Sequence, residues 1–198
     1  MSEVIRIGID TSKHIFQLHG VDAAERPVLR KRLTRKQMLE FFAKLPATQV
    51  GMEACGAAHY WARELGKLGH EVKLMAPQHV KPYVKRNKND GRDAEALCEA
   101  MSRPTMRFVL VKSAEQQAAL MLTGLREQMI ARRTQLSNMI RGYAAEFGIT
   151  AAKGLNQIEP LLAQIAQDES VPELARDLLA QQGRQYAQLQ GELKAIEA

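Results

Sequence analysis

Four acidic residues stand where predicted strands end or a predicted helix begins, and they are the side chains best placed to do chemistry. Asp10 follows an alternating apolar segment, Glu53 ends a short apolar segment, and Asp90 and Asp93 open a helix. Acids three residues apart on a helix project from one face. Clustered carboxylates bind hard cations such as Mg²⁺ or Mn²⁺, and two such ions about 4 Å apart support in-line phosphoryl transfer. We therefore predict a catalytic metal site made by Asp10, Glu53, Asp90 and Asp93.

Each of these acids also has a purely structural interpretation. An aspartate at the end of a strand is often a turn former. Asp90 and Asp93 could simply cap a helix, where acids interact favourably with the positive end of the helix dipole. The placement of all four at the ends of separate elements is what favours a shared site.

Basic residues precede the second acidic pair and continue into it. The candidates for nucleic-acid binding are Lys81, Lys85, Arg86, Lys88 and Arg92. Pro82 interrupts this segment, which suits an exposed basic loop or a broken helix. Such residues would hold phosphates beside the metal without sequence preference, although surface Lys and Arg often only increase solubility. Tyr83, within the same segment, fits packing better than base stacking.

A second basic cluster occupies residues 30–36, with Arg30, Lys31, Arg32, Arg35 and Lys36. It permits the same two interpretations, but it does not adjoin the acids in the sequence. Other chemistries have little support. The five histidines lack zinc-ligand spacing, and no glycine-rich phosphate loop is present. Cys55 has no base placed with it, so we expect it in the core.

Hydrophobic periodicity predicts the elements that position the acids. Three strands come first, then helices and strands alternate, with predicted strands at 4–10, 15–21, 28–33, 49–53 and 71–75. A capping box at Thr34 and Gln37 starts the first helix. Three consecutive strands followed by strands joined through helices predict an α/β fold with a mixed sheet of the ribonuclease H type, over residues 1–110. The first and fourth strands would then be neighbours, with Asp10 and Glu53 side by side.

Residues 111–198 predict a helical, coiled-coil region. One long helix runs from Ser113 to about Phe147, another follows Pro160, and the last starts at a capping box of Ser170 and Glu173. The apolar seams repeat every seven residues at Leu122, Met129, Leu136 and Tyr143, and again at Leu179, Tyr186 and Leu193. Two hypotheses are equally supported: the helices pack on one another as an intramolecular hairpin, or they form a homo-oligomer.

Composition sets further limits on the function. The 198 residues carry 28 Lys and Arg against 22 Asp and Glu, a net charge of +6. The excess is uneven, with 19 basic against 12 acidic residues up to residue 110 and 3 against 7 from residue 154 onward. A polyanionic partner would therefore meet the first part of the chain. We expect no membrane span, no signal peptide and no disulfide between the two cysteines, which is typical of a protein of the reducing cytoplasm.

Three segments in this order resemble a known family. They are IGIDTSK at 7–13, GMEACG at 51–56 and NKNDGRDAEAL at 87–97. They resemble the DEDD-motif transposases of bacterial insertion sequences, which have a RuvC-like N-terminal domain and act as bridge-RNA-guided recombinases. The resemblance covers roughly residues 4 to 150. It implies that Asp10, Glu53, Asp90 and Asp93 bind Mg²⁺, that DNA and a guide RNA are partners, and that the long helix assembles subunits.

The resemblance also implies a missing part. Family members continue into a second domain with a catalytic serine that becomes joined to DNA, so we expect a truncated member that does not recombine DNA alone. Two alternatives stay open. One is a non-catalytic fragment for nucleic-acid binding and oligomerisation, and the other is a stand-alone RuvC-like junction nuclease. A sugar-kinase-like ATPase shares the Gly-Ile-Asp-Thr strand end but needs phosphate-binding turns that the sequence lacks.

Overall fold

The computed structural model describes residues 3–12, 14–84 and 90–197, the side chains of residues 90 and 91 excepted. The chain forms two compact units, residues 1–116 and residues 117–198. Within the described ranges, no helix is both long enough and apolar enough to cross a membrane.

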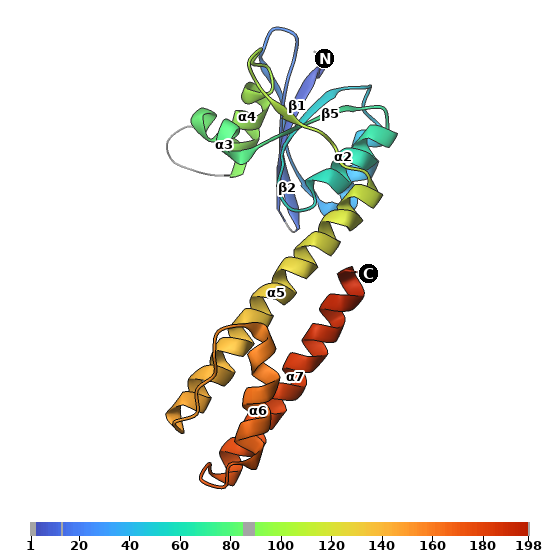
Figure 1. Ribbon diagram of the computed structural model, residues 1–198. Coiled ribbons are helices and arrows are strands. Elements are labelled where there is room, and N and C mark those ends of the chain that lie inside the picture. Colours follow the sequence, from blue (N-terminus) through green and yellow to red (C-terminus); the bar gives the residue numbers. More distant parts are fainter. Residues whose placement is uncertain (1–2, 13, 85–89, 198) are drawn as a thin grey trace. The chain divides into compact units, whose positions relative to one another are not determined.

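Unit 1 is built on one sheet (Figure 1). Its six described strands are β1 Arg6–Thr11, β2 Ile15–Val21, β3 Pro27–Thr34, β4 Gln49–Glu53, β5 Glu71–Met75 and β6 Phe108–Val109, in the order β3-β2-β1-β4-β5-β6. β1, β2 and β3 form an antiparallel meander, β4 and β5 run parallel to β1, and β6 is antiparallel to β5. This order confirms the predicted mixed α/β sheet of the ribonuclease H type. β6 was not predicted, because two residues are too short to show a periodicity.

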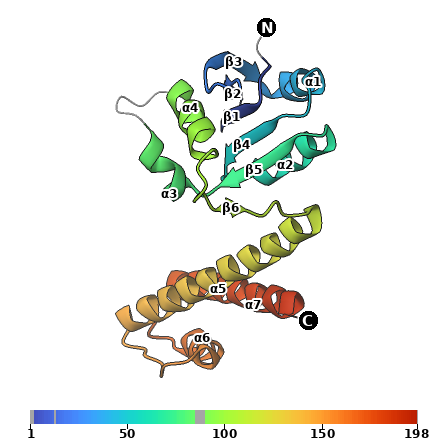
Figure 2. The same ribbon diagram turned by 90° about the horizontal axis from the view of Figure 1, so that it is seen from above.

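Helices cover both faces of this sheet (Figure 2). They are α1 Met38–Ala43, α2 Ala58–Lys67, α3 Pro77–Val80 and α4 Asp90–Ala100, with short 3-10 turns at Arg35–Gln37 and Lys81–Tyr83. α1 and α2 lie on one face, and α3 and α4 lie on the other. The predicted capping box is present, since the Thr34 backbone N–H donates to Gln37 Oε1 at 2.9 Å.

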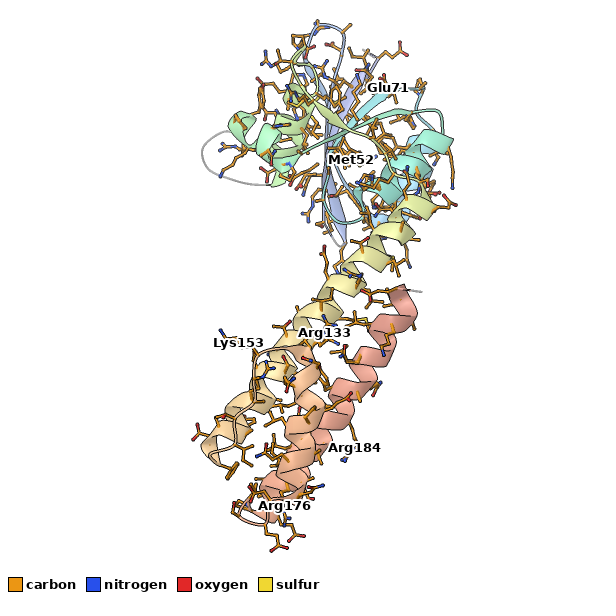
Figure 3. The ribbon with its side chains drawn as sticks, viewed as in Figure 1. Met52, Glu71, Arg133, Lys153, Arg176 and Arg184 are labelled. Atoms are coloured by element: carbon orange, nitrogen blue, oxygen red, sulfur yellow. The ribbon has the colours of Figure 1, made fainter. Side chains whose placement is uncertain are left out.

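The two faces of the sheet differ in chemistry. The face under α1 and α2 is apolar and forms the main core, with Ile7, Ile9, Phe16, Leu18, Val50, Met52 and Leu74 all buried. Met52, labelled in Figure 3, is fully buried. Strand alternation turns the intervening residues to the other face, and most of these are small or polar: Arg6, Gly8, Asp10, Gln17, His19, Gly51 and Glu53. The second face therefore receives α4 over polar side chains and bare backbone, and at β5 over Met75, which packs with Leu97 and Met101 of the α4 segment.

α4 lies unusually close to the strands beneath it. A Cβ added to Gly8 would stand 2.1 Å from the Ala94 carbonyl oxygen, and one added to Gly51 would stand 2.5 Å from Met101 Sδ. The Arg6 guanidinium also donates from Nε to the Cys98 carbonyl oxygen at 3.0 Å. These contacts fix the height of α4 above the sheet, and with it the first turn that carries Asp93.

Unit 2 is helical and has a core of its own. The elements are α5 Ala114–Glu146, which starts within the range of unit 1, a 3-10 turn at Leu155–Gln157, α6 Ile158–Gln167 and α7 Glu173–Glu197. Buried residues of α5, α6 and α7 pack together, among them Ile140, Ala144, Ile158, Leu161, Ile165, Leu179 and Tyr186. Arg133 of α5, labelled in Figure 3, donates from Nη1 to Gln190 Oε1 of α7 at 3.2 Å. The helices of this unit thus pack on one another within the chain.

The seam of α7 is confirmed, because Leu179, Tyr186 and Leu193 are all buried. The predicted start of this helix at Ser170 is wrong. The Ser170 backbone N–H and hydroxyl both donate to Asp168 Oδ1, at 2.9 and 2.5 Å, so this serine belongs to the preceding turn. α6 begins two residues before Pro160, which occupies the first turn, where proline is tolerated.

The predicted seam of α5 is partly wrong. Leu122 and Tyr143 are 52% and 56% exposed. Met129 of the predicted seam is buried, and Leu136 packs against the helical core. The other buried residues of this helix are Ser137, Ile140 and Ala144, which were not predicted. The small side chains of Ser137 and Ala144 let neighbouring helices approach, and a search for large apolar residues passes over them.

Candidate functional site

Asp10 and Glu53 meet at the ends of neighbouring parallel strands. β1 pairs with β4 up to Ile9 opposite Met52. One further step in this register sets Asp10 against Glu53, and alternation turns both toward the face that carries α4. The predicted neighbourhood of the first and fourth strands is therefore confirmed.

These two acids line a cavity of about 510 Å³ together with a third. The lining residues are Asp10, Glu53, Pro77, Val80, Lys81, Val84, Asp93 and Leu97. Asp10, Glu53 and Asp93 are each partly buried. Asp90 is the first residue of α4, but its side chain lies outside the described residues. The structure thus brings three of the four predicted acids to one cavity from three elements.

A tight turn holds Glu53 in place. The Ala54 N–H donates to the Met75 carbonyl oxygen at 2.7 Å, and the Cys55 N–H donates to the Glu53 carbonyl oxygen at 2.8 Å. Ala57, which precedes α2, has a φ of +67°, a left-handed conformation that costs a non-glycine residue energy.

Cys55 lies in this turn and corrects a prediction. We expected it in the core, but it is exposed, with its Sγ 3.4 Å from Thr11 Oγ1. The reason is that the chain leaves the sheet at Glu53, so the alternation that buries β4 residues no longer applies. The Thr11–Cys55 contact links the two segments that follow Asp10 and Glu53.

The chemistry of the lining suits a hard divalent cation. Carboxylate oxygens are the preferred ligands of Mg²⁺ and Mn²⁺, and Pro77, Val80, Val84 and Leu97 add an apolar wall. Among the side chains that the structure describes, however, no three His, Cys, Asp or Glu residues stand close enough to hold one ion. The three described acids share a cavity without forming a closed ligand set.

The predicted basic residues fall in different places. Lys81 lies in the 3-10 turn after α3 and lines the acid cavity, whereas Arg92 lines a separate hollow on another side of α4. Lys85, Arg86 and Lys88 lie outside the described residues. Tyr83 packs against the apolar cluster that contains Met75 and Val80, and the Arg103 guanidinium lies 5.7 Å from its ring. Packing, rather than base stacking, is what its surroundings support.

The apolar wall of the cavity was not predicted from the sequence. Leu97 follows Asp93 by four residues, a spacing that places both on one helix face. Its position beside the acids could therefore have been predicted from the sequence. The positions of Pro77, Val80 and Val84 could not, because only the path of the chain after β5 brings them to the acids.

A comparison with protein families gives one match that spans most of the chain. The sequence model of the IS110-type DEDD transposases, described as "Transposase", matches residues 7–148. This chain belongs to the DEDD transposase family. Residues 10, 53, 90 and 93 all fall within the matched segment, so the acid cavity lies in the part of the chain that defines membership of the DEDD transposases.

Several curated transposases are similar to the chain. A putative transposase of Sinorhizobium fredii is 61% identical over 197 residues, covering 100% of this chain and 51% of the relative. A probable family 20 transposase of Pseudomonas aeruginosa is 50% identical, covering 98% and 56%. The transposase of insertion sequence element IS1328 from Yersinia enterocolitica is 40% identical, covering 100% and 59%. The chain spans about half the length of the curated relatives that it matches.

Among solved structures, the RuvC of T. thermophilus in complex with a Holliday junction substrate matches with a TM-score of 0.39 and 13% identity, over 54% of this chain and 100% of that chain. A similarity this weak adds nothing to the strand order described above.

Proposed function

We propose that this chain supplies the acidic, metal-binding part of a DNA transposase. One observation carries the proposal: Asp10, Glu53 and Asp93 line a single cavity in a chain of the DEDD transposase family. Asp90 begins α4 three residues before Asp93, and residues with this spacing share a helix face. We therefore assign Asp10, Glu53, Asp90 and Asp93 to Mg²⁺ binding, with Mn²⁺ as a substitute.

The four acids are positioned by different elements. Asp10 and Glu53 stand on paired strands, so their separation is set by the sheet. Asp93 and Asp90 come from α4, whose position depends on its contact with the strands. Bound divalent ions would activate the attacking oxygen and stabilise the leaving oxygen of a phosphodiester. Lys81, at the wall of the cavity, would hold a phosphate oxygen beside the acids.

DNA is the proposed substrate, bound through Lys81, Lys85, Arg86, Lys88 and Arg92, and a guide RNA is the proposed second partner. We propose that the protein meets both partners in the bacterial cytoplasm. Phosphate contacts by such residues supply affinity that falls as salt rises, without selecting a sequence.

The metal assignment is tested by thermal unfolding with and without millimolar Mn²⁺. A ligand present at about 100 times its Kd stabilises the folded state by about 2.7 kcal/mol. We expect this gain in the wild type, its loss in Asp10→Asn and in Glu53→Gln, and its retention in Glu40→Gln. Glu40 is an exposed acid of α1, on the opposite face of the sheet, that pairs with Lys44. An equal response in all four proteins would contradict the assignment.

A second candidate function is a non-catalytic fragment that binds nucleic acid and assembles subunits. One observation favours it: α5 exposes several large apolar side chains, which are Leu120, Met121, Leu122 and Leu125. Exposed apolar stretches of this kind mark interaction sites, so we propose a homo-oligomer formed through the helical unit.

Incubation with branched and linear DNA in Mg²⁺ separates these functions. Cleavage of branched DNA that Asp10→Asn abolishes would establish a junction nuclease active in this chain alone. Binding without cleavage, combined with a Mn²⁺ response, fits the metal-binding part of a transposase. Binding with neither cleavage nor a Mn²⁺ response leaves the assembly fragment.

A further inference from the structure

A second hollow lies on the side of α4 that faces β2 and β3. Its volume is about 520 Å³, and its lining residues are Gln17, Leu18, His19, Arg30, Lys31, Arg32, Arg92 and Glu95. The lining carries four cationic residues and one carboxylate. It includes part of the 30–36 basic cluster, which the proposed function does not use.

The pairing of β3 with β2 decides which of these basic side chains face the hollow. Arg30 lies opposite His19, and Arg32 lies opposite Gln17. His19 and Gln17 in turn lie opposite Gly8 and Asp10 of β1. Because directly paired residues share a face, both arginines stand on the face of the sheet that carries α4.

Lys31 stands on the opposite face. It lies opposite Leu18, a member of the main core. Its Nζ is 4.8 Å from the centre of the Phe41 ring, where it makes a cation–π contact. The ammonium group of Lys31 is therefore held beside α1, on the face of the sheet away from α4.

The hollow adjoins the acid cavity at two points. Arg92 lines the hollow, and the next residue, Asp93, lines the acid cavity. Gln17 lines the hollow, and its partner across the strands, Asp10, lines the acid cavity. Arg32 on β3 and Asp10 on β1 are separated by two strand spacings, about 10 Å, because β2 lies between these strands. This span matches about three nucleotides of a strand that rises 3.4 Å per nucleotide.

We propose that Arg30, Arg32 and Arg92 bind the phosphodiester backbone of a nucleic-acid strand that runs across β3 and β2 to the acid cavity. The inference rests on the proposed function, since it takes a nucleic acid to be the molecule that reaches the acids. Guanidinium groups bind phosphate oxygens in a bidentate manner, and backbone contacts of this kind position a strand without selecting its sequence.

A basic edge strand has another explanation, which is protection against pairing with a second sheet. β3 is the edge of this sheet, and charged residues on edge strands prevent aggregation. Edge protection depends on the presence of charge and makes no distinction between the two faces. Phosphate binding requires Arg30 and Arg32, while Lys31 is dispensable.

The test compares two charge-matched double variants of the full chain. Arg30→Gln with Arg32→Gln removes the pair that faces the hollow. Lys31→Gln with Lys36→Gln removes two cations of the same cluster that do not face it, since Lys36 is exposed in the 3-10 turn after β3. The probes are fluorescein-labelled strands of about 20 nucleotides, longer than the usual site for single strands. Single-stranded DNA, single-stranded RNA of the same sequence and duplex DNA are titrated by anisotropy in EDTA.

Loss of two phosphate contacts lowers the slope of log K against log salt by about 1.8 for duplex DNA and about 1.4 for single strands. Between about 50 and 200 mM salt, binding of the wild type should therefore weaken about seven- to twelvefold more than binding of the arginine variant. The lysine variant should keep the slope of the wild type. The probe that shows the change identifies DNA or RNA as the source of the phosphates.

Equal slopes in the arginine variant and the wild type overturn the inference, and so do equal losses in the two double variants. Because titrations in EDTA do not involve the metal, a failure here leaves the Mn²⁺ response of the wild type intact. Conversely, the wild type could show no Mn²⁺ response while the salt slope still depends on Arg30 and Arg32. That result overturns the proposed metal site alone. Urea unfolding of both variants checks the fold, with changes within about 0.5 kcal/mol expected for surface substitutions.

Discussion

Gly8 of β1 lies opposite Gly51 of β4, and both present bare backbone on the face of the sheet that α4 covers. The pair forms a strip of bare backbone in the middle of the sheet. Only such a strip lets the helix come close enough for Asp93 to share a cavity with Asp10 and Glu53. The acid site therefore depends on two residues that have no side chains.

Substitution of Gly8 should disturb both stability and metal binding. Gly8→Ala places a Cβ 2.1 Å from the Ala94 carbonyl oxygen and 2.5 Å from the Cys98 nitrogen, so the backbone of α4 must move. We expect a loss of about 1–3 kcal/mol in the free energy of unfolding, as for other overpacked sites, together with a weaker Mn²⁺ response. Urea unfolding with and without Mn²⁺ measures both effects.

Gly66→Ala is the matched control. Gly66 lies within α2, and a Cβ there would have no atom within 4 Å. Gly66 is in the last turn of α2, where alanine keeps part of the advantage of about 0.8–1 kcal/mol that it has over glycine in a helix interior, so this variant should be at least as stable as the wild type. If both alanine variants unfold at the same urea concentration, α4 is not held at the distance described.

His59 should make unit 1 less stable in mild acid. Its Nδ1 accepts a hydrogen bond from the Lys112 backbone N–H at 3.1 Å. Burial, followed by the charges of Lys112 and Arg63, lowers the pKa of His59 below 6.5. The unfolded chain therefore takes up a proton more readily, so stability is fully present above about pH 6.5 and is lost as pH falls toward the folded pKa.

His59→Gln should remove this part of the pH dependence. Thermal unfolding between about pH 7.5 and 5 measures it, across the range in which histidine titrates. The wild type should lose more stability than the variant over that range. Parallel curves for the two proteins would show that His59 titrates alike in the folded and unfolded states.

The two cysteines should differ sharply in reactivity. Cys55 is exposed, whereas Cys98 is on the side of α4 that is buried against β1, and burial raises the pKa of the Cys98 thiol. The thiolate is the reactive form, so a thiol reagent at about pH 8 should modify one cysteine in the folded protein and two in urea. Cys55→Ser should abolish the modification of the folded protein, and Cys98→Ser should preserve it. Two fast-reacting thiols in the folded wild type would contradict the placement of α4.

Two adjacent leucines of α7 provide a matched pair in unit 2. Leu179 is 3% exposed, and Leu178 is 51% exposed. Leu179→Ala should cost about 2–5 kcal/mol, because it leaves a cavity in the helical core. Leu178→Ala should change stability by no more than about 0.5 kcal/mol, as other surface substitutions do. Chemical denaturation followed by circular dichroism measures both, and similar costs at the two positions would argue against the helical packing described.

The sequence predicts an element most accurately where its apolar pattern matches the burial that the fold gives it. β2, β4 and β5 occupy the expected residues, because their alternating or continuous apolar runs end at clear turn residues. The meeting of Asp10 and Glu53 follows from strand order alone. The cavity wall from Pro77 to Val84 does not, because it depends on contacts between distant parts of the chain.

The prediction fails in α5, where the large apolar residues of the heptad are not all the residues that pack against the other helices. Tyr143 fits the heptad of α5 and is exposed, while Ser137 does not fit it and is 1% exposed. Helix contacts select size as well as polarity. The two arginines that face the second hollow were also beyond the sequence, since their side of β3 depends on its register with β2.

The chemical difference between the two faces of the sheet bears on how the protein folds as it is synthesised. α1 and α2, which cover the apolar face, precede the last of the long strands in the sequence, whereas α4 follows all of them. Before α4 is made, the face that it will cover presents mostly small or polar residues, such as Arg6, Gly8, Asp10 and Gly51, with Met75 of β5 as a large apolar exception. A partly made chain on the ribosome would thus expose less of the surface that drives aggregation, and α4, the last of the helices that cover the sheet, would complete the acid cavity.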